Sequence, residues 1–351
     1  MAQPYVTVEV ISTPPSTLTS ITSVQLTKGR VKVSDNLRTG TATVTGRKPG
    51  DLPALQIGDT IQLTVTDPDT STTAEFNYRL ADLIIDYGIV NNMDTWTMLL
   101  EDAFAYLGRA VITRSWSSGT LAVDQAANVT NDVGIALITS GTGKSTVSAQ
   151  TITDGNALEV FQNLVNTEQA LVQAGDNDIT WYNRGWQSSI TYTNFADDGT
   201  ANKYDVLKFA GLADNYADEV VVYPVGASAV SFGAGAFSYS LNSYSVDSAT
   251  ATDLAAYVKG VFDVQDAVPT VMSTLLNTAS TAGPLTATGV GKGVNVKFRG
   301  TTYTALVEGF VITSDPQSTR ITYYLSSAEF FSFLTLDDAL LGKLDENKLG
   351  F

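Results

Sequence analysis

The stretch GDTIQLTV (58–65) has a counterpart late in the chain, GKGVNVKF (291–298). Each begins with a glycine turn and continues as an alternation of apolar and polar residues, which is typical of a strand with one buried face. The next two strands are LADLIIDY (80–87) and DTWTMLLED (94–102) in the first case, and LVEGFVIT (306–313) and STRITYYLSS (318–327) in the second. The pattern predicts a duplicated unit of strands; two unrelated meanders of similar shape are the alternative.

Around the first copy, most of the first hundred residues alternate in the same way. The apolar residues that lie two apart are Val24 and Leu26, Ala42 and Val44, Ile61, Leu63 and Val65, and Phe76, Tyr78 and Leu80. The turns between them are expected at Gly40, Pro49-Gly50, Gly58-Asp59 and 67–69. Short strands at this spacing predict a small barrel or a sandwich.

Between the two copies the pattern becomes helical. Asn156 followed by Glu159 resembles a capping box, and it opens a helix whose apolar face is Leu158, Phe161, Leu164 and Val165. A turn at 174–177 and a strand at 178–182 follow, so we expect a helix packed on a hairpin. A second helix is predicted from about Asp253 to Asp263, and strands return after Pro269.

Composition excludes several function classes. The 351 residues include 20 Lys and Arg against 36 Asp and Glu, a net charge of −16, which argues against wrapping nucleic acid because phosphate binding needs clustered cations. The acidity either keeps the protein soluble or keeps DNA from sticking to a conduit. Cysteine and histidine are both absent, which excludes disulfides, Cys/His zinc sites and Ser–His–Asp chemistry. Residues 220–246 carry no charge, but Pro224 and several glycines make them a poor membrane helix and favour strands.

The segment SGTGKST (140–146) resembles a phosphate-binding loop only in part. Such a loop needs a glycine five residues before the glycine that precedes its lysine, because the backbone must wrap around the phosphates. Gly143 precedes Lys144, and the earlier position holds Ile138, a β-branched residue that resists positive φ. We therefore predict a surface loop.

Some acidic and aromatic residues could belong either to a functional site or to ordinary turns and strands. Asp176 with Asp178, and Asp197 with Asp198, lack the spacing of a calcium loop and are predicted to form turns. A carboxylate pair for glycoside cleavage can meet only in space, and nothing in the sequence points to one. Trp181, Tyr182 and Trp186 would form either a sugar platform or part of a strand and its core.

Three stretches together resemble a known family. They are GRVKVSDNLRTGTATVTGRKPGDL (29–52), NALEVFQNLVNTEQALVQAGDNDITWYNR (156–184) and the ending LDDALLGKLDENKLGF (336–351). In this order they are similar to the tail-hub (minor tail) proteins of long-tailed bacteriophages, relatives of the trimeric hub ring in contractile-tail baseplates. Where the family often has Glu-Gly-Gly, this chain has Glu168-Gln169-Ala170.

The resemblance implies a mainly β fold with α+β insertions, in which two tail-tube-like β-barrels share one chain with smaller helix-and-hairpin domains. The domains expected are a first barrel (1–110), a middle α+β domain (111–235) of which part can return to the first barrel, a second barrel with one helix (236–335), and a docking tail (336–351). Three such chains would present six barrels, so that a three-fold ring matches a six-fold tail tube.

The function implied is that of a structural virion component at the tail tip, a hub ring that forms the passage for tape measure and DNA. The expected partners are two further copies in a homotrimer, the distal tail and tail tube proteins, other minor tail or spike proteins, and the tape measure protein, with DNA only in transit. No catalytic, cofactor or metal site is expected. The alternatives are a receptor- or sugar-binding minor tail protein and, ranked lower, a cell-wall hydrolase.

The contact residues expected lie in the apolar ending of the chain. They are Phe330, Phe331, Phe333, Leu336, Leu340, Leu344, Leu349 and Phe351. Apolar anchors supply most of the energy in such contacts, and we predict that these side chains dock on a neighbouring subunit or the next tail-tip protein. Folding back onto their own domain is the alternative, because both kinds of burial look alike in sequence.

Overall fold

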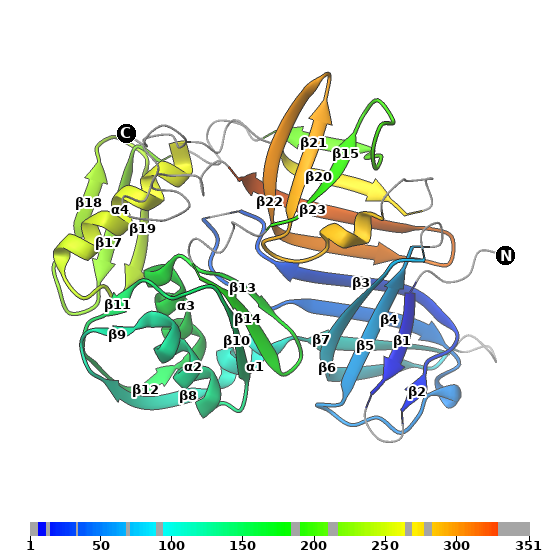
Figure 1. Cartoon of the computed structure of the whole chain (residues 1–351). Coiled ribbons are helices and arrows are strands. Elements are labelled where there is room, and N and C mark those ends of the chain that lie inside the picture. The colour runs from blue at the N-terminus through cyan, green and yellow to red at the C-terminus, as the bar shows by residue number, and fades with distance from the viewer. Residues whose placement is uncertain are drawn as a thin grey trace.

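A computed structural model gives the fold of the chain. It describes residues 6–11, 15–32, 34–67, 71–88, 94–183, 190–209, 217–263, 269–276 and 283–328. Figure 1 shows two groups of strands, one above the other, an α+β domain beside the lower group and a smaller lobe around helix α4.

The first group of strands forms a six-stranded unit. Its members are β1 (Val6–Val10), β3 (Ile21–Gly29), β4 (Thr41–Arg47), β5 (Thr60–Thr66), β6 (Thr73–Asp86) and β7 (Thr95–Glu101). Side by side they run in the order β3-β4-β7-β6-β5-β1, with the short β2 (Ser16–Thr17) added at the edge. The residues that alternate in the sequence, from Val24 to Leu80, all lie on the buried face, as predicted.

The second group repeats this arrangement. Its members are β15 (Tyr192–Ala196), β16 (Val206–Phe209), β20 (Pro269–Leu275), β21 (Gly293–Phe298), β22 (Thr301–Ser314) and β23 (Thr319–Ser327). Their lateral order, β16-β20-β23-β22-β21-β15, is that of the first unit strand for strand, and the order along the chain is also the same. One direction differs, because β1 is antiparallel to β5 whereas β15 is parallel to β21.

The middle strand of each unit is long and bent. Both β6 and β22 have 14 residues. The first half of each pairs with the strand before it and the second half with the strand after it. The register shifts in both where the partner changes, between Leu80 and Asp82 in β6 and between Val307 and Gly309 in β22. A β-bulge bends a strand, so the same device turns the same strand in both units.

The two units are joined edge to edge. Strand β3 pairs antiparallel with β22, from Gly29 opposite Gly309 to Val24 opposite Ser314, and a 13-stranded sheet results. One hydrophobic core serves both units, and the rings of Phe76 and Phe310 meet across it at 5.5 Å. The predicted fold class is confirmed as mainly β with α+β insertions. The structure adds that the two predicted barrels share a sheet and a core.

The α+β domain follows β7. It contains α1 (Ala103–Arg109), β8 (Val111–Trp116), β9 (Thr120–Leu121), α2 (Ala122–Asp132), β10 (Ala136–Ser140), β11 (Thr146–Val147), β12 (Gln150–Asn156), α3 (Ala157–Glu168), β13 (Leu171–Ala174) and β14 (Asp178–Tyr182). The side chain of Asn156 accepts a hydrogen bond from the N–H of Glu159 at 3.1 Å, so the predicted helix start is confirmed. Strands β13 and β14 form the predicted hairpin, and α3 belongs to the same core.

A smaller lobe is inserted between β16 and β20. It consists of β17 (Glu219–Pro224), β18 (Val230–Gly233), β19 (Ser238–Ser243) and α4 (Ser248–Asp263). The uncharged segment therefore forms strands, and none of the described helices is long and apolar enough to cross a membrane. Helix α4 begins at Ser248, earlier than predicted, because Asp247 accepts a hydrogen bond from the N–H of Thr250 at 2.7 Å and caps it.

The predicted domain boundaries stay a proposal. Strand pairing assigns 192–209 and 269–327 to the same unit. In the first unit, residues 30–40 connect β3 to β4, and the lobe lies at the corresponding connection of the second unit, between β16 and β20. We therefore favour a division in which the lobe, 217–263, is an insertion into the second unit.

Candidate functional site

Two glycines allow the two units to meet. Gly29 and Gly309 lie opposite each other in the β3–β22 ladder. A Cβ atom on Gly29 would lie 2.3 Å from the carbonyl oxygen of Glu308, and one on Gly309 would lie 2.5 Å from that of Arg30. Gly29 also has a φ of 75°, which favours glycine. The seam between the units thus needs the close backbone approach that only glycine permits.

A buried ion pair fastens the same seam. The Nε atom of Arg30 donates a hydrogen bond to Oε2 of Glu308 at 2.7 Å, and the Arg30 N–H donates to the Glu308 carbonyl oxygen at 3.0 Å. The other carboxylate oxygen of Glu308 accepts from the hydroxyl of Ser326 at 2.6 Å. Glu308 is fully buried and lies at the bulge of β22, so both of its oxygens are satisfied inside the protein.

The face of the joined sheet that points away from the core is rich in hydroxyl groups. Three rows of side chains run across the strands there: Leu99, Thr43, Gln25, Thr313, Arg320 and Leu275; Thr41, Thr27, Val311, Thr322, Ser273 and Val206; and Thr97, Thr45 and Ser23. We call these residues the hydroxyl face. Hydroxyl pairs such as Thr27 with Thr41 (3.1 Å) and Ser273 with Thr322 (2.9 Å) connect neighbouring strands.

Over β4, β3 and β22 the three rows contain no charged side chain. Charged residues lie at both ends of the rows: Arg320, whose guanidinium lies 2.5 Å from a carboxylate oxygen of Asp205, at one end, and Asp82, Glu101 and Arg79, which follow Leu99 and Thr41, at the other. The face also continues across the seam, since Gln25 of the first unit lies opposite Thr313 of the second. The middle of this surface is thus polar and uncharged within these rows, and both units contribute to it.

A second buried ion pair fastens the α+β domain to the first unit. The ammonium of Lys28 donates to the carbonyl oxygen of Ala174 at 2.6 Å, and it lies 3.5 Å from Asp102 and 3.9 Å from the ring centre of Tyr78. Asp102 in turn accepts hydrogen bonds from the N–H groups of Gly40 (2.8 Å) and Phe104 (3.2 Å), which caps α1.

Burial controls the electrostatics of this junction. It raises the pKa of Asp102 to about 6, against the opposing effect of the nearby Lys28 ammonium. Burial also lowers the pKa of Lys28, opposed by Asp102 and, more weakly, by Asp178 and Asp176. The pKa of the Tyr78 hydroxyl lies well above its usual value for the same reason. The charged forms of Asp102 and Lys28 are therefore unfavourable in this buried place unless each has the other as its partner.

Two backbone amides of segment 140–146 are already bound to a carboxylate of the chain. The carboxylate of Glu168 accepts hydrogen bonds from the N–H groups of Lys144 at 3.1 Å and Ser145 at 2.7 Å, and Glu168 is fully buried. Ile138 lies within β10 and pairs with Thr180. A carboxylate of the chain itself stands where a phosphate would have to bind, which agrees with the prediction that this is no nucleotide site.

Solved structures share the architecture described above. A 43 kDa tail protein of prophage MuSo2 from Shewanella oneidensis aligns with a TM-score of 0.66 at 10% identity, over 93% of this chain and 99% of that one. A tail protein from Neisseria meningitidis MC58 aligns with a TM-score of 0.65 at 11% identity, over 93% and 97%. This chain has the fold of phage tail proteins. No family model and no curated protein matches its sequence.

A third relative extends the likeness beyond phages. The E. coli c3393 protein, a component of the type VI secretion system with structural similarity to the T4 tail proteins gp27 and gp5, aligns with a TM-score of 0.53. Its identity is 9%, and the alignment covers 92% of this chain and 77% of that one. The predicted resemblance to tail proteins is thus confirmed at the level of the fold.

The tail-protein fold explains two of the stretches that carried the resemblance. Stretch 29–52 begins with Gly29-Arg30, the residues that form the seam with β22. Stretch 156–184 contains α3 and the β13–β14 hairpin. Gln169, at the departure from Glu-Gly-Gly, ends α3 with a φ of 54°, the left-handed conformation in which a glycine would be unstrained.

The predicted contact residues, Phe330, Phe331, Phe333, Leu336, Leu340, Leu344, Leu349 and Phe351, lie outside the described residues. The predicted last strand ends at Ser327, as expected. Sequence reasoning missed Glu308 and Gly309, although a lone carboxylate within the apolar strand LVEGFVIT (306–313) was a usable signal.

The remaining candidates have structural roles. Trp181 is fully buried and donates a hydrogen bond from its indole N–H to Asn183 at 2.7 Å. The prediction that it belongs to a strand and its core is therefore confirmed. Trp186 lies outside the described residues. Asp198 pairs with Lys297 at 2.7 Å, and Asp176 accepts a hydrogen bond from Thr60 at 3.0 Å. Within the described parts of the chain, no three metal-binding side chains come together.

Proposed function

We propose that this protein is a structural component of a phage tail tip, in which three copies form a hub ring. The observation that carries the proposal is the duplicated six-stranded unit, with the same strand order twice in one chain. Three chains of this kind present six equivalent units, which lets a three-fold ring contact a six-fold tail tube through repeated surfaces.

The open form of the sheet supports assembly through its edges. The strand order of the 13-stranded sheet ends at β16 on one side and at β2 on the other. Edge strands carry backbone groups that pair readily with another chain. Joining the second unit of one copy to the first unit of the next would close the ring, and each copy would use both of its edges once.

The hydroxyl face is the surface we assign to the passage. Its rows cross the seam between the units, so it would run around the inside of the ring without interruption. Phosphate binding depends on clustered cations, and the rows hold none over β4, β3 and β22, while Arg320 at one end is paired with Asp205. A polar wall without clustered cations would let DNA and the tape measure protein pass without holding either.

The proposed partners are the other two copies, the distal tail and tail tube proteins, the tape measure protein, and other minor tail or spike proteins. The proposal includes no catalysis and no cofactor. The alternative, a sugar-binding minor tail protein, gains no support from Trp181, because this side chain is buried in the core of the α+β domain.

The mass of the purified full-length protein in native mass spectrometry tests the ring. We expect a species of three chains, and a protein that stays monomeric at micromolar concentration in the presence of its tail tube protein would contradict the proposal. Deleting 336–351 tests the predicted contact residues. Loss of tail assembly is expected, whereas normal tails built with the truncated protein would refute an assembly role.

A further inference from the structure

The seam within one chain also indicates how two chains can join. At the seam, β3 of the first unit pairs with the second half of β22. The second half of β6 is the counterpart in the first unit; it pairs with β7 on one side, and beyond Leu80 no described strand pairs with its other side. The counterpart of β3 is β16, which ends the strand order and, among the described strands, pairs only with β20. The chain therefore has one unused copy of each edge that forms the seam.

The strand pairs show which residues correspond in the two units. Counted from the register shift in each middle strand, Thr313 of β22 corresponds to Asp86 of β6. Gln25 of β3 corresponds to Lys208 of β16, because each lies opposite the equivalent residue of the next strand. At the seam, Thr313 lies opposite Gln25. A contact between two chains in the same register would thus place Asp86 of one copy opposite Lys208 of the next.

The next pair along this ladder is apolar. At the seam, Ile312 lies opposite Leu26 in the shared core. The corresponding residues are Ile85 and Phe209, which are 37% and 40% exposed in the single chain. The ring of Phe209 lies 5.2 Å from that of Tyr303, so it already packs on its own unit. Pairing the two edges would remove apolar surface of both copies from water.

Charge supports the same register. Asp86 and Lys208 are both exposed, and neither forms an ion pair with another described residue. Opposite charges that face each other across an antiparallel strand pair stabilise it, whereas like charges destabilise it. A shift by one residue would place Asp86 opposite Phe209 and turn the paired side chains of one strand to the other face of the sheet. The two edges are therefore complementary in one register.

We propose that copies of this chain join by pairing the second half of β6 in one copy antiparallel with β16 of the next, in the register of the seam. We call this contact the inter-copy joint. The occupant of each unused edge is thus a second copy of the chain. On the first unit, the edge that takes part is the free side of β6 rather than β2, where the strand order ends. The inference rests on the proposed ring of three chains and names the strands that close it.

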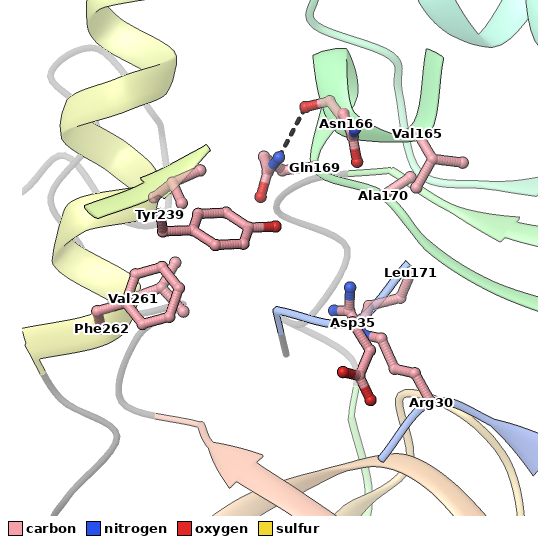
Figure 2. A pocket seen from close by; sticks show the side chains of 11 residues that line it. Arg30, Asp35, Val165, Asn166, Gln169, Ala170, Leu171, Tyr239, Val261 and Phe262 are labelled. Atoms are coloured by element: carbon pink, nitrogen blue, oxygen red, sulfur yellow. Dashed lines mark hydrogen bonds between the residues drawn. The ribbon is translucent and has the colours of Figure 1, made fainter. Parts of the chain in front are cut away.

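The seam has contacts that the inter-copy joint lacks. Arg30 binds Glu308 at the bulge of β22, whereas the corresponding residue at the bulge of β6 is Ala81. Arg30 also lines a cavity of about 40 Å³, and Figure 2 shows Arg30 and Leu171 on one side of it and Tyr239 of the lobe on the other. The inter-copy joint is therefore the weaker of the two contacts, and it can be broken while each chain stays folded.

Disulfide trapping tests the inter-copy joint, because the chain has no cysteine of its own. Opposite residues of an antiparallel ladder lie within reach of a disulfide. The variant Asp86→Cys with Lys208→Cys should therefore link three chains under mild oxidation. The control variant, Thr17→Cys with Lys208→Cys, moves the first cysteine to an exposed position of β2 and should link more slowly.

The register has a matched control of its own. Ile85→Cys with Phe209→Cys should link as fast as the cysteines at 86 and 208. Ile85→Cys with Lys208→Cys should link slowly, because these two side chains point to opposite faces of the sheet in the proposed register.

Charge reversal gives a readout without oxidation. Lys208→Glu places two carboxylates opposite each other, so the native mass spectrum should shift from three chains to one. Asp86→Lys should have the same effect, and the two changes combined should restore the species of three chains. Both residues are exposed, so circular dichroism should show that each single variant stays folded.

The outcomes separate the inter-copy joint from the proposed function. A wild-type protein that stays monomeric with its tail tube protein present would overturn the ring and the joint together. A wild-type species of three chains in which position 17 links to position 208 as fast as position 86 does would overturn the joint and leave the ring. The same holds if Lys208→Glu leaves the species of three chains intact.

Discussion

The two six-stranded units have the same strand order and the same bent middle strand, but they use the bend differently. The bulge of β6 is at Ala81, a small and partly exposed residue, whereas the bulge of β22 is at Glu308, a fully buried carboxylate that holds Arg30 of the other unit. The comparison teaches that residues of both units form the seam, Gly29 and Arg30 on one side and Glu308 and Gly309 on the other, whereas the bulge residue takes part in it only in the second unit. Four predictions test or sharpen this contrast.

Gly309→Val should have the largest effect, because its Cβ would lie 2.5 Å from the Arg30 carbonyl oxygen and prevent β3 from pairing with β22. We expect a loss of about 4 kcal/mol or more in the free energy of unfolding, measured by urea denaturation. Gly50→Ala is the matched control, since a Cβ there meets no atom within 4 Å. Equal stability of the two variants would show that the seam is not under steric constraint.

Glu308→Gln should destabilise the protein by about 3 kcal/mol, because it leaves the partly buried Arg30 guanidinium without its counter-charge. Ala81→Ser, at the bulge of the first unit, should change stability by less than about 0.5 kcal/mol. Adding Arg30→Gln to Glu308→Gln should cost little more than Glu308→Gln alone. Strictly additive losses would mean that the two side chains do not act as a pair.

Asp102→Asn should change how stability depends on pH at the junction of the first unit with the α+β domain. The pKa of Asp102 is raised from 3.8 to about 6, so the folded protein binds a proton more tightly than the unfolded chain. The contribution of this group is therefore fully present below pH 3.8 and is lost as the pH rises through 6. Wild type should gain roughly 2 kcal/mol relative to the Asn variant between pH 7 and pH 4. Parallel curves of unfolding free energy against pH would contradict this.

Gln169→Gly should have the smallest effect and the opposite sign. A φ of 54° strains any residue with a Cβ, so glycine should stabilise the end of α3 by up to about 1 kcal/mol, reduced by loss of the hydrogen bond from the Gln169 amide to Asn166. The thermal midpoint should rise. Gln169→Val should lower it, and a lower midpoint for both variants would show that the side-chain hydrogen bond outweighs the strain.

The sequence predicted those features of the fold that depend on residues close together in the chain. Alternation identified the strands of the first unit, the Asn156 cap identified α3, and the glycine turns exposed the repeat, because each depends on residues close together in the chain. The start of α4 was placed too late, since Asp247 was not recognised as its cap.

The seam could not be predicted in this way. Arg30 and Glu308 are far apart in the chain, and no local pattern specifies which edge of one unit pairs with which edge of the other. The lobe could not be recognised as a separate insertion either, because the sequence patterns of its strands resemble those of the unit that it interrupts. The predicted contact residues beyond Ala328 stay a prediction, which the deletion of 336–351 addresses.

The central claim is that a unit duplicated within one chain lets three chains match a six-fold tube. A cryo-electron microscopy map of the virion tail tip at a resolution that separates strands tests it most directly. The account predicts three copies of this chain in one ring, with six strand units around the axis and the hydroxyl face turned inward. Six copies, or a ring with the hydroxyl face turned outward, would contradict it.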